Sequence, residues 1–252
     1  QNSTRPHIAV SSDGGTFLAQ WVRFDGLGNS VQTVVGTVSG TTETLGATDT
    51  VGNAVKDWTF PAVTISADGS AGYVIWTASD GSNDRVRGKS VAITTSPSIS
   101  TVYDTLYTEH SAAGADAGDP AVRVSPDGTR AVAVWVHDDG TAHVAEASQA
   151  TIVSGVWTWT APVVVSASET SHSARLTQVA VSNDGTHAAA IWSRAIPAPT
   201  RPLGNPPAPT REVVESAALG GGSLPPTGSN PCASNRSCVS ATFSNFTISP
   251  CS

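Results

Sequence analysis

The chain has 252 residues, which is enough for one large all-β domain with a single core. Charged residues make up 13% of it, about half the usual share, and the formal net charge is −7 with only 13 Lys and Arg residues. This thin negative charge without a basic run excludes nucleic acid and anionic membrane surfaces as partners, because both require clustered Lys and Arg. Membrane insertion is not expected either, since no segment approaches the roughly 18 apolar residues of a membrane span.

Four segments of the chain share one pattern, in which an S-x-D-G turn is followed eight residues after its Asp by a Trp. The period is about 57 residues. The turn aspartates are Asp13, Asp68, Asp127 and Asp184, and the tryptophans are Trp21, Trp76, Trp135 and Trp192. Self-similarity at a fixed period predicts a repeat architecture, and a Trp at one position of every repeat predicts packing between the repeats.

Within each repeat the pattern predicts antiparallel strands joined by tight turns. The first strand alternates apolar and polar residues, as in Ile8 and Val10, which is the period of a strand with one buried face. Asp-Gly pairs then mark a hairpin before and after the Trp strand. The predicted third strands are 31–38, 86–93 and 143–152, and the fourth is clearest at 156–159 with 162–166. The predicted fold is therefore an all-β propeller of four tandem four-stranded blades over residues 1–195, as a small ring, an open arc or a ring completed by another chain.

Residues 196–252 form a second region, a Pro- and Gly-rich tail that carries all three cysteines, Cys232, Cys238 and Cys251. Residues 211–219 are predicted as a third strand of the fourth repeat or as a short helix. Residues 238–248 are predicted as a terminal strand that completes the fourth blade or pairs with a neighbouring subunit. The cysteines indicate local disulfide formation, with three pairings open. Together with Gln1 at the start and the lack of Met, they predict an exported chain, secreted or at the cell surface.

The turn and the strand that precedes it resemble known families. The S-P-D-G-T turn at Ser125–Thr129 and the P-x-V-x-V-S start are similar to blades of TolB-type and other bacterial secreted propellers. The run from Ser154 to Ser168 and the following V-A-V-S-N-D-G are similar to repeats of sialidase-like propellers. The Asp-box pattern of that group, S-x-D-x-G-x-T-W, is only approximated by Ser11–Phe17. The resemblance covers residues 5–192 and implies a propeller architecture.

Three aromatic residues outside the repeated Trp position are candidates for stacking on a sugar, namely Trp58, Trp157 and Trp159. An oxygen-rich loop, Asp80, Asn83 and Asp84, is a candidate Ca²⁺ site, and no other cofactor is expected. The sequon residues Asn2, Asn235 and Asn245 are candidate glycosylation sites.

Catalysis is not expected from the sequence. The positions predicted to line a central channel are mostly Ala, Ser and Thr, and Arg123 is the only basic residue among them. Tyr103, Tyr107 and Glu109 lack the arginine set that a sialidase-type site needs. The predicted function is a non-catalytic extracellular structural or interaction module that binds protein, either itself through its tail or a cell-surface component. The alternatives are a carbohydrate-binding propeller and a divergent sialidase-like glycoside hydrolase.

Overall fold

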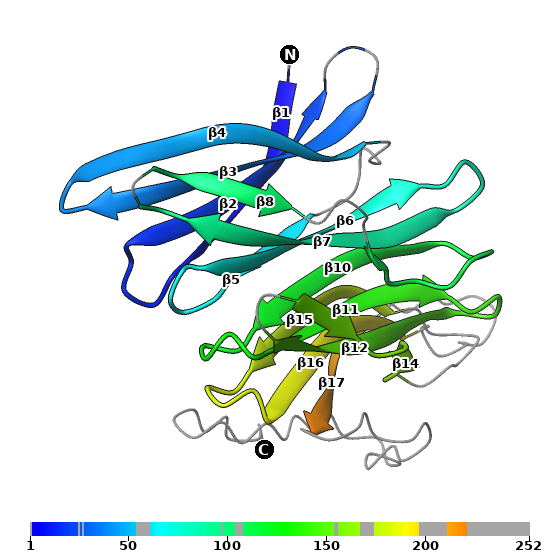
Figure 1. The fold of residues 1–252 in the computed structure, drawn as a ribbon. Helices are drawn as coiled ribbons and strands as arrows, with labels where there is room; N and C mark the ends of the chain where they lie inside the picture. Colours follow the sequence, from blue (N-terminus) through cyan, green and yellow to red (C-terminus); the bar gives the residue numbers. More distant parts are fainter. Residues whose placement is uncertain are drawn as a thin grey trace, which may run out of the picture.

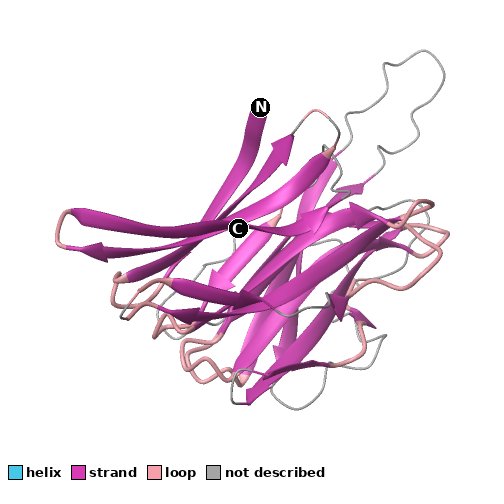
Figure 2. Ribbon diagram, turned by 45° about the horizontal axis from the view of Figure 1, so that its top comes forward, coloured by secondary structure: helices cyan, strands magenta, loops and turns pink. Residues whose placement is uncertain are grey.

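The computed structural model describes residues 2–24, 26, 28–53, 61–96, 98–103, 108–153, 156–166, 174–196 and 211–220. All regular structure in these ranges is β-strand, and Figure 2 shows them without a helix. Accordingly, none of the described residues belongs to a helix that is long and apolar enough to span a membrane. The expectation of an all-β fold is confirmed.

The strands form four antiparallel sheets that follow one another along the chain. Sheet 1 contains β1 (Asn2–Val10), β2 (Thr16–Phe24), β3 (Asn29–Ser39) and β4 (Thr42–Asn53). Sheet 2 contains β5 (Ala62–Ile65), β6 (Ala71–Ser79), β7 (Asp84–Thr94), β8 (Ser100–Tyr103) and β9 (Thr108–Glu109). Sheet 3 contains β10 (Ala117–Val124), β11 (Arg130–Asp138), β12 (His143–Val153), β13 (Val156–Trp159) and β14 (Val163–Val164). Sheet 4 contains β15 (Ala174–Val181), β16 (His187–Ile196) and β17 (Arg211–Gly220).

The arrangement of the sheets is propeller-like, with each sheet packed face to face on the next. Figure 1 shows sheet 1 at the top and sheet 4 at the bottom of this stack. We call the side of a sheet that faces the preceding sheet its leading face and the opposite side its trailing face. The alternation of side chains along each strand gives every sheet one face of each kind.

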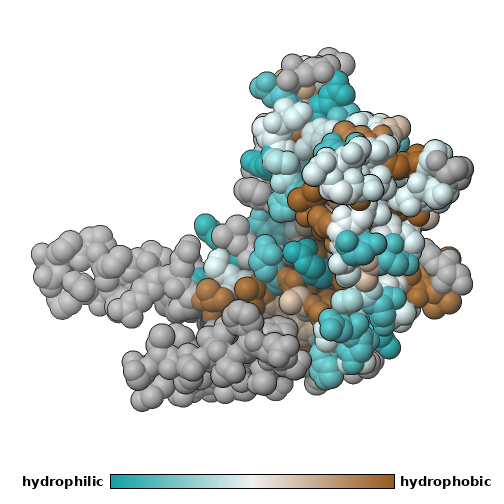
Figure 3. All heavy atoms as spheres, turned by 90° about the vertical axis from the view of Figure 1, so that its left-hand side faces the viewer, coloured by the Kyte–Doolittle hydropathy of each residue, from teal (hydrophilic) through white to brown (hydrophobic). Residues whose placement is uncertain are grey.

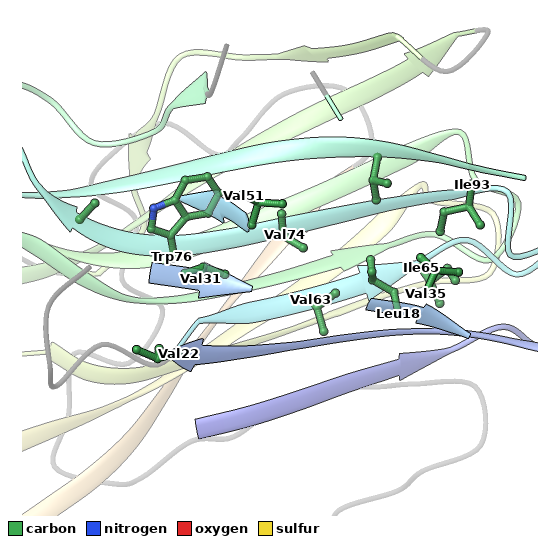
Figure 4. Close-up of a cluster of buried hydrophobic side chains, with 12 residues drawn as sticks. Leu18, Val22, Val31, Val35, Val51, Val63, Ile65, Val74, Trp76 and Ile93 are labelled. Atoms are coloured by element: carbon green, nitrogen blue, oxygen red, sulfur yellow. The ribbon is translucent and has the colours of Figure 1, made fainter. Parts of the chain in front are cut away.

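The core lies between the sheets rather than inside any one of them. In the first interface, Leu18, Val31 and Val35 on the trailing face of sheet 1 meet Val63 and Trp76 on the leading face of sheet 2 (Figure 4). Separate buried clusters fill the interface between sheets 2 and 3 and the interface between sheets 3 and 4. Each sheet therefore depends on its neighbours for burial of its apolar faces.

The repeated tryptophans lie on the leading faces. Trp76, Trp135 and Trp192 are buried against the sheet that precedes each of them, which confirms the packing role expected for them. Gly52 allows Trp76 to lie flat on β4, because a Cβ at Gly52 would come within 2.5 Å of the indole ring. Trp21 differs in being only half-buried, because no described sheet covers the leading face of sheet 1.

The S-x-D-G segments form the turns between the first two strands of every sheet. Ser11 Oγ donates to Asp13 Oδ1 at 2.6 Å, and the same oxygen accepts the N–H of Gly15 at 2.8 Å. Ser66, Ser125 and Ser182 donate in the same way to Asp68, Asp127 and Asp184. The glycines that follow adopt positive φ, which explains why Asp-Gly recurs there.

These hydrogen bonds lower the pKa of all four turn aspartates, with the Ser hydroxyl as the largest cause in each. Because the folded pKa lies below the ordinary value of 3.8, the stabilisation is fully present above about pH 4 and is lost as the pH falls through the folded pKa. We expect the urea midpoint to fall between about pH 4 and pH 2, and to fall less steeply in Ser182→Ala. Equal slopes in both proteins would show that the Ser182 hydroxyl does not set this pH dependence.

The structure differs from expectation in sheet 4. Four strands were predicted for each repeat, whereas the described part of sheet 4 has three, in the order β15-β16-β17. Residues 211–220 form a strand that pairs with β16 along its whole length, which resolves the choice between strand and helix. The predicted terminal strand at 238–248 lies outside the described residues, as do the three cysteines.

Candidate functional site

The most chemically varied part of the structure lies at the ends of sheets 2 and 3 opposite the S-x-D-G turns. It is formed by the β6–β7 hairpin, the β11–β12 hairpin and the segment that leads into β10. In an antiparallel sheet these connections fall at the same end of the strands, so their side chains can meet.

The β6–β7 hairpin is held together by Asp80. Its Oδ1 accepts the N–H groups of Ser82 at 2.9 Å and Asn83 at 2.8 Å, and its Oδ2 lies 3.3 Å from Arg85 Nη1. The backbone hydrogen bond from Asn83 is the largest of the causes that lower the pKa of Asp80, followed by that from Ser82. Asp80 is thus an ionised turn residue whose two oxygens are both engaged.

Asp116 ties this hairpin to sheet 3. Its Oδ1 accepts the N–H of Asp84 at 2.8 Å and the side-chain amide of Asn83 at 3.4 Å. Its main-chain carbonyl accepts the N–H of Asp138 at 2.8 Å. The backbones of Asp84 and Asp138, from two different sheets, are therefore both hydrogen-bonded to Asp116. Their surroundings differ, because Asp84 is buried, Asp138 is partly exposed and Asp116 is exposed.

A buried arginine of β7, Arg85, binds β9 and the residues that follow it. Arg85 donates through Nη2 to the carbonyl of Ser111 at 2.6 Å and lies 3.1 Å from Glu109 Oε2. Arg87 Nε lies 2.6 Å from the other oxygen of Glu109. Both oxygens of Glu109 are occupied by arginines, so its role is to hold β9 against β7. In the sequence analysis, Glu109 was considered together with Tyr103 and Tyr107. In the structure, the arginine partners of Glu109 come from β7.

Asp119, in the same region, has an unusual backbone conformation. It has a φ of 49°, and it precedes Pro120 at a register shift in the β10–β11 pairing. Arg5, with a φ of 55°, precedes Pro6 at the matching shift in sheet 1. A β-bulge at this point re-aims the first strand as it enters each sheet. Because the positive φ recurs at the matching position of two sheets, we attribute it to the architecture of the repeat.

Two glutamates face the repeated Trp residues, and sequence reasoning missed both. Glu146 Oε2 accepts the indole N–H of Trp135 at 2.9 Å, and its Oε1 lies 3.2 Å from His137 Nδ1. Glu215 accepts the indole N–H of Trp192 at 3.0 Å and pairs with Arg194. The available signal was the position directly opposite the Trp on the third strand, since a buried indole N–H needs an acceptor.

Trp157 and Trp159, two of the predicted sugar-stacking residues, lie on β13 and pack on the aromatic side chains of sheet 2. Their ring centroids are 4.9 Å and 5.0 Å from that of Tyr73. Trp159 also meets His110 edge to face at 4.6 Å, and the Tyr73 hydroxyl lies 2.9 Å from His110 Nε2. Burial lowers the pKa of His110 to about 3, so this histidine is neutral. Sugar stacking by these rings stays a prediction, and Trp58 lies outside the described residues.

The structure places the other predicted site residues as follows. Of the proposed Ca²⁺ ligands, Asp80 is engaged by the turn and by Arg85, and Asn83 donates its amide to Asp116. No group of three or more His, Cys, Asp and Glu side chains suited to a metal occurs in the described ranges. Asn2 is exposed on β1, while Asn235 and Asn245 fall beyond the described residues. Ca²⁺ binding and glycosylation stay predictions.

An open cleft of about 330 Å³ lies between sheets 3 and 4. It is lined by the outer part of sheet 3, including Gln149, Thr151 and Thr158, together with Ala188 and Leu219 of sheet 4. In sheets 1 to 3 a further strand lies beyond the third one, whereas the described part of sheet 4 ends with β17. Arg130 and Gly185 place the cleft near the S-x-D-G turns, away from the carboxylates of Asp84, Asp116 and Asp138.

No protein-family model matches the chain, and no curated protein matches it. Solved structures resemble it in fold. An α-L-arabinofuranosidase from Lactobacillus brevis is 13% identical, with a TM-score of 0.44 over 90% of this chain and 76% of that one. A protein from Lactobacillus plantarum is 11% identical, with a TM-score of 0.41 over 79% of this chain and 59% of that one. A glycoside hydrolase is 10% identical, with a TM-score of 0.39 over 88% of this chain and 74% of that one.

Two expectations from the sequence, that the chain is a non-catalytic module and that it is not an enzyme, are at odds with the names of these structures. Two of the three similar structures are named as an arabinofuranosidase and a glycoside hydrolase. The expectation rested on the predicted channel-lining positions and on Tyr103, Tyr107 and Glu109. It gave no catalytic role to Asp84, Asp116 and Asp138, which lie at strand ends and in a loop. Loops that a rigid scaffold positions are common places for catalytic groups.

Proposed function

We propose that this chain, with its propeller-like arrangement of four sheets, is a glycoside hydrolase whose catalytic carboxylates lie at the joined ends of sheets 2 and 3. The observation that carries the proposal is the position of Asp116. Its carboxylate is bound by the N–H of Asp84, and its carbonyl binds the N–H of Asp138. These hydrogen bonds bring the backbones of three aspartates that are distant in the sequence to the same end of sheets 2 and 3.

The chemistry of glycoside cleavage fits such a set. One carboxylic acid donates a proton to the glycosidic oxygen, while a second carboxylate attacks the sugar or activates a water molecule. The two groups must differ in environment so that one is protonated and the other ionised. Asp84 is only 7% exposed, whereas the Asp138 side chain is 40% exposed. We assign these two roles to the pair Asp84 and Asp138, with Asp116 as the residue that positions their backbones.

The surface supports a carbohydrate as the substrate class. Figure 3 shows one face of the molecule largely in near-white and teal, with separate brown apolar patches. Ser and Thr are frequent in the chain, and their hydroxyls can exchange hydrogen bonds with sugar hydroxyls. An exported protein that meets extracellular glycans is in keeping with this composition and with the cysteine-bearing tail. The proposed localisation is therefore extracellular.

The test is turnover of a panel of aryl pentofuranosides, aryl hexopyranosides and plant and bacterial polysaccharides. We expect at least one substrate to be hydrolysed, and we expect Asp84→Asn and Asp138→Asn each to lower kcat by about 100-fold or more. Glu43→Gln is the matched control, since it removes an exposed acid on β4, far from these carboxylates, and should leave kcat unchanged. Circular dichroism would verify that each variant is folded. The proposal fails if no substrate is turned over, or if both aspartate variants retain full kcat.

A further inference from the structure

Among the described residues, each of the two end sheets of the stack has one face on which no other sheet packs, whereas the matching face is buried in the other sheets. On the leading faces, one position of the first strand is occupied by Ile8, Val63, Val122 and Val179 in the four repeats. Val63, Val122 and Val179 are at most 7% exposed, whereas Ile8 is 62% exposed. Two residues further on, Val10 is 53% exposed, while Ile65 and Val124 are buried. Sheet 1 therefore has apolar residues at these positions although no described sheet packs on them.

The trailing faces show the same contrast at the other end of the stack. The residue before the repeated Trp is Gln20, Ile75, Val134 or Ile191. The first three are fully buried by the sheet that follows, whereas Ile191 is 40% exposed. Val214, two strand positions away on the same face, is exposed as well. Sheet 4 therefore presents two exposed apolar side chains, Ile191 and Val214, on a trailing face that no described sheet covers.

The S-x-D-G turns show the same difference between the end sheets and the sheets that have a neighbour. The turn glycine of each later sheet sits on the sheet before it. A Cβ at Gly69 would lie 2.8 Å from Thr16, and a Cβ at Gly185 would lie 2.9 Å from Arg130. A Cβ at Gly14 of sheet 1 would meet nothing within 4 Å. In sheet 4 the residue that matches Thr16 and Arg130 is His187, which is exposed.

We propose that the trailing face of sheet 4 in one copy of this chain packs on the leading face of sheet 1 in a second copy. The three internal interfaces are the template, because each joins a trailing face to a leading face at these same repeat positions. A head-to-tail contact of this kind closes when two copies each use both faces. The product is a ring of eight sheets, within the range of four to eight that propellers adopt, and it leaves no end face uncovered.

The contact can be broken from either side without disturbing the fold of one chain. Ile8→Glu and Ile191→Glu each place a charge on one end face, at a residue that is exposed in the single chain. Val102→Glu is the matched control, since Val102 is 70% exposed but lies on β8 of sheet 2, which is not an end sheet. The measurement is the mass in solution by light scattering and sedimentation, over a wide range of protein concentration.

We expect the native protein and Val102→Glu to have about twice the 25.6 kDa mass of one chain, and each end-face variant to have the mass of one chain. An equimolar mixture of Ile8→Glu and Ile191→Glu should recover a two-chain species, because one intact pair of faces remains. A native protein with the mass of one chain at every concentration would overturn the proposal. So would dimers that persist in Ile191→Glu, since these would mean that sheet 1 pairs with itself. Species that grow beyond two chains would exclude the closed ring.

Discussion

Replacing Trp135 by alanine is expected to lower the free energy of unfolding by about 3–5 kcal/mol. The side chain is completely buried between sheets 2 and 3, where Tyr73, Ile75 and Val86 surround it. Its removal leaves a large cavity, and the sheets cannot close over it because each is held by its own hydrogen-bond ladder. The carboxylate of Glu146 would also lose the indole N–H that it accepts at 2.9 Å.

Trp21→Ala is the matched control for this loss. Trp21 occupies the same position of its repeat but is only half-buried on the open leading face of sheet 1. Guanidinium unfolding of both variants should give a clearly smaller loss for Trp21→Ala. Equal losses would contradict the view that the cost arises from burial between sheets. Because association would cover Trp21, the comparison is made in an Ile8→Glu background.

Gly88→Ala is expected to lower the free energy of unfolding by about 1–3 kcal/mol, the usual cost of overpacking. A Cβ at Gly88 would lie 2.4 Å from Tyr73 Cε1 and 2.6 Å from its hydroxyl. Tyr73 cannot move aside, because its ring is in contact with Trp157 and Trp159 and its hydroxyl lies against His110. A single methyl group would therefore disturb the packing between sheets 2 and 3.

Gly28→Ala provides the control for Gly88→Ala. A Cβ at Gly28 meets nothing within 4 Å, so the effect there comes from the unfolded chain, in which Ala has less conformational freedom than Gly. The two variants should differ in sign or be well separated in their urea midpoints. If Gly88→Ala were as stable as the native protein, β7 and Tyr73 would have to be able to separate at little cost.

Much of the architecture could be predicted because its signals are local. The alternation in Ile8 and Val10 and the Asp-Gly turns specified strands and hairpins, and the predicted third strand 143–152 is β12, His143–Val153. The role of the repeated Trp was predictable for the same reason, since one position in every repeat has one environment. The exception was Trp21, whose environment depends on a neighbour that the repeat pattern assumes.

The candidate site was much less predictable. Asp84 entered the sequence analysis as a calcium ligand, and Asp116 and Asp138 had no assigned role. Their convergence depends on one hydrogen bond from the N–H of Asp84 to Asp116, between residues 32 positions apart. No local pattern encodes such a contact, because it arises only when two separately formed sheets pack at a particular offset.

The sequence by itself determined the all-β class, the fourfold repeat, the turn chemistry and the positions of the interface tryptophans. Each of these follows from short-range backbone preferences and from a period of two in side-chain burial. Only the tertiary structure decided which aspartates are joined by backbone hydrogen bonds, which glutamates accept the indole N–H groups and which faces no described sheet covers. These depend on the packing of one sheet against the next, where a side chain such as Ile8 or Val63 is exposed or buried according to whether a neighbouring sheet is present.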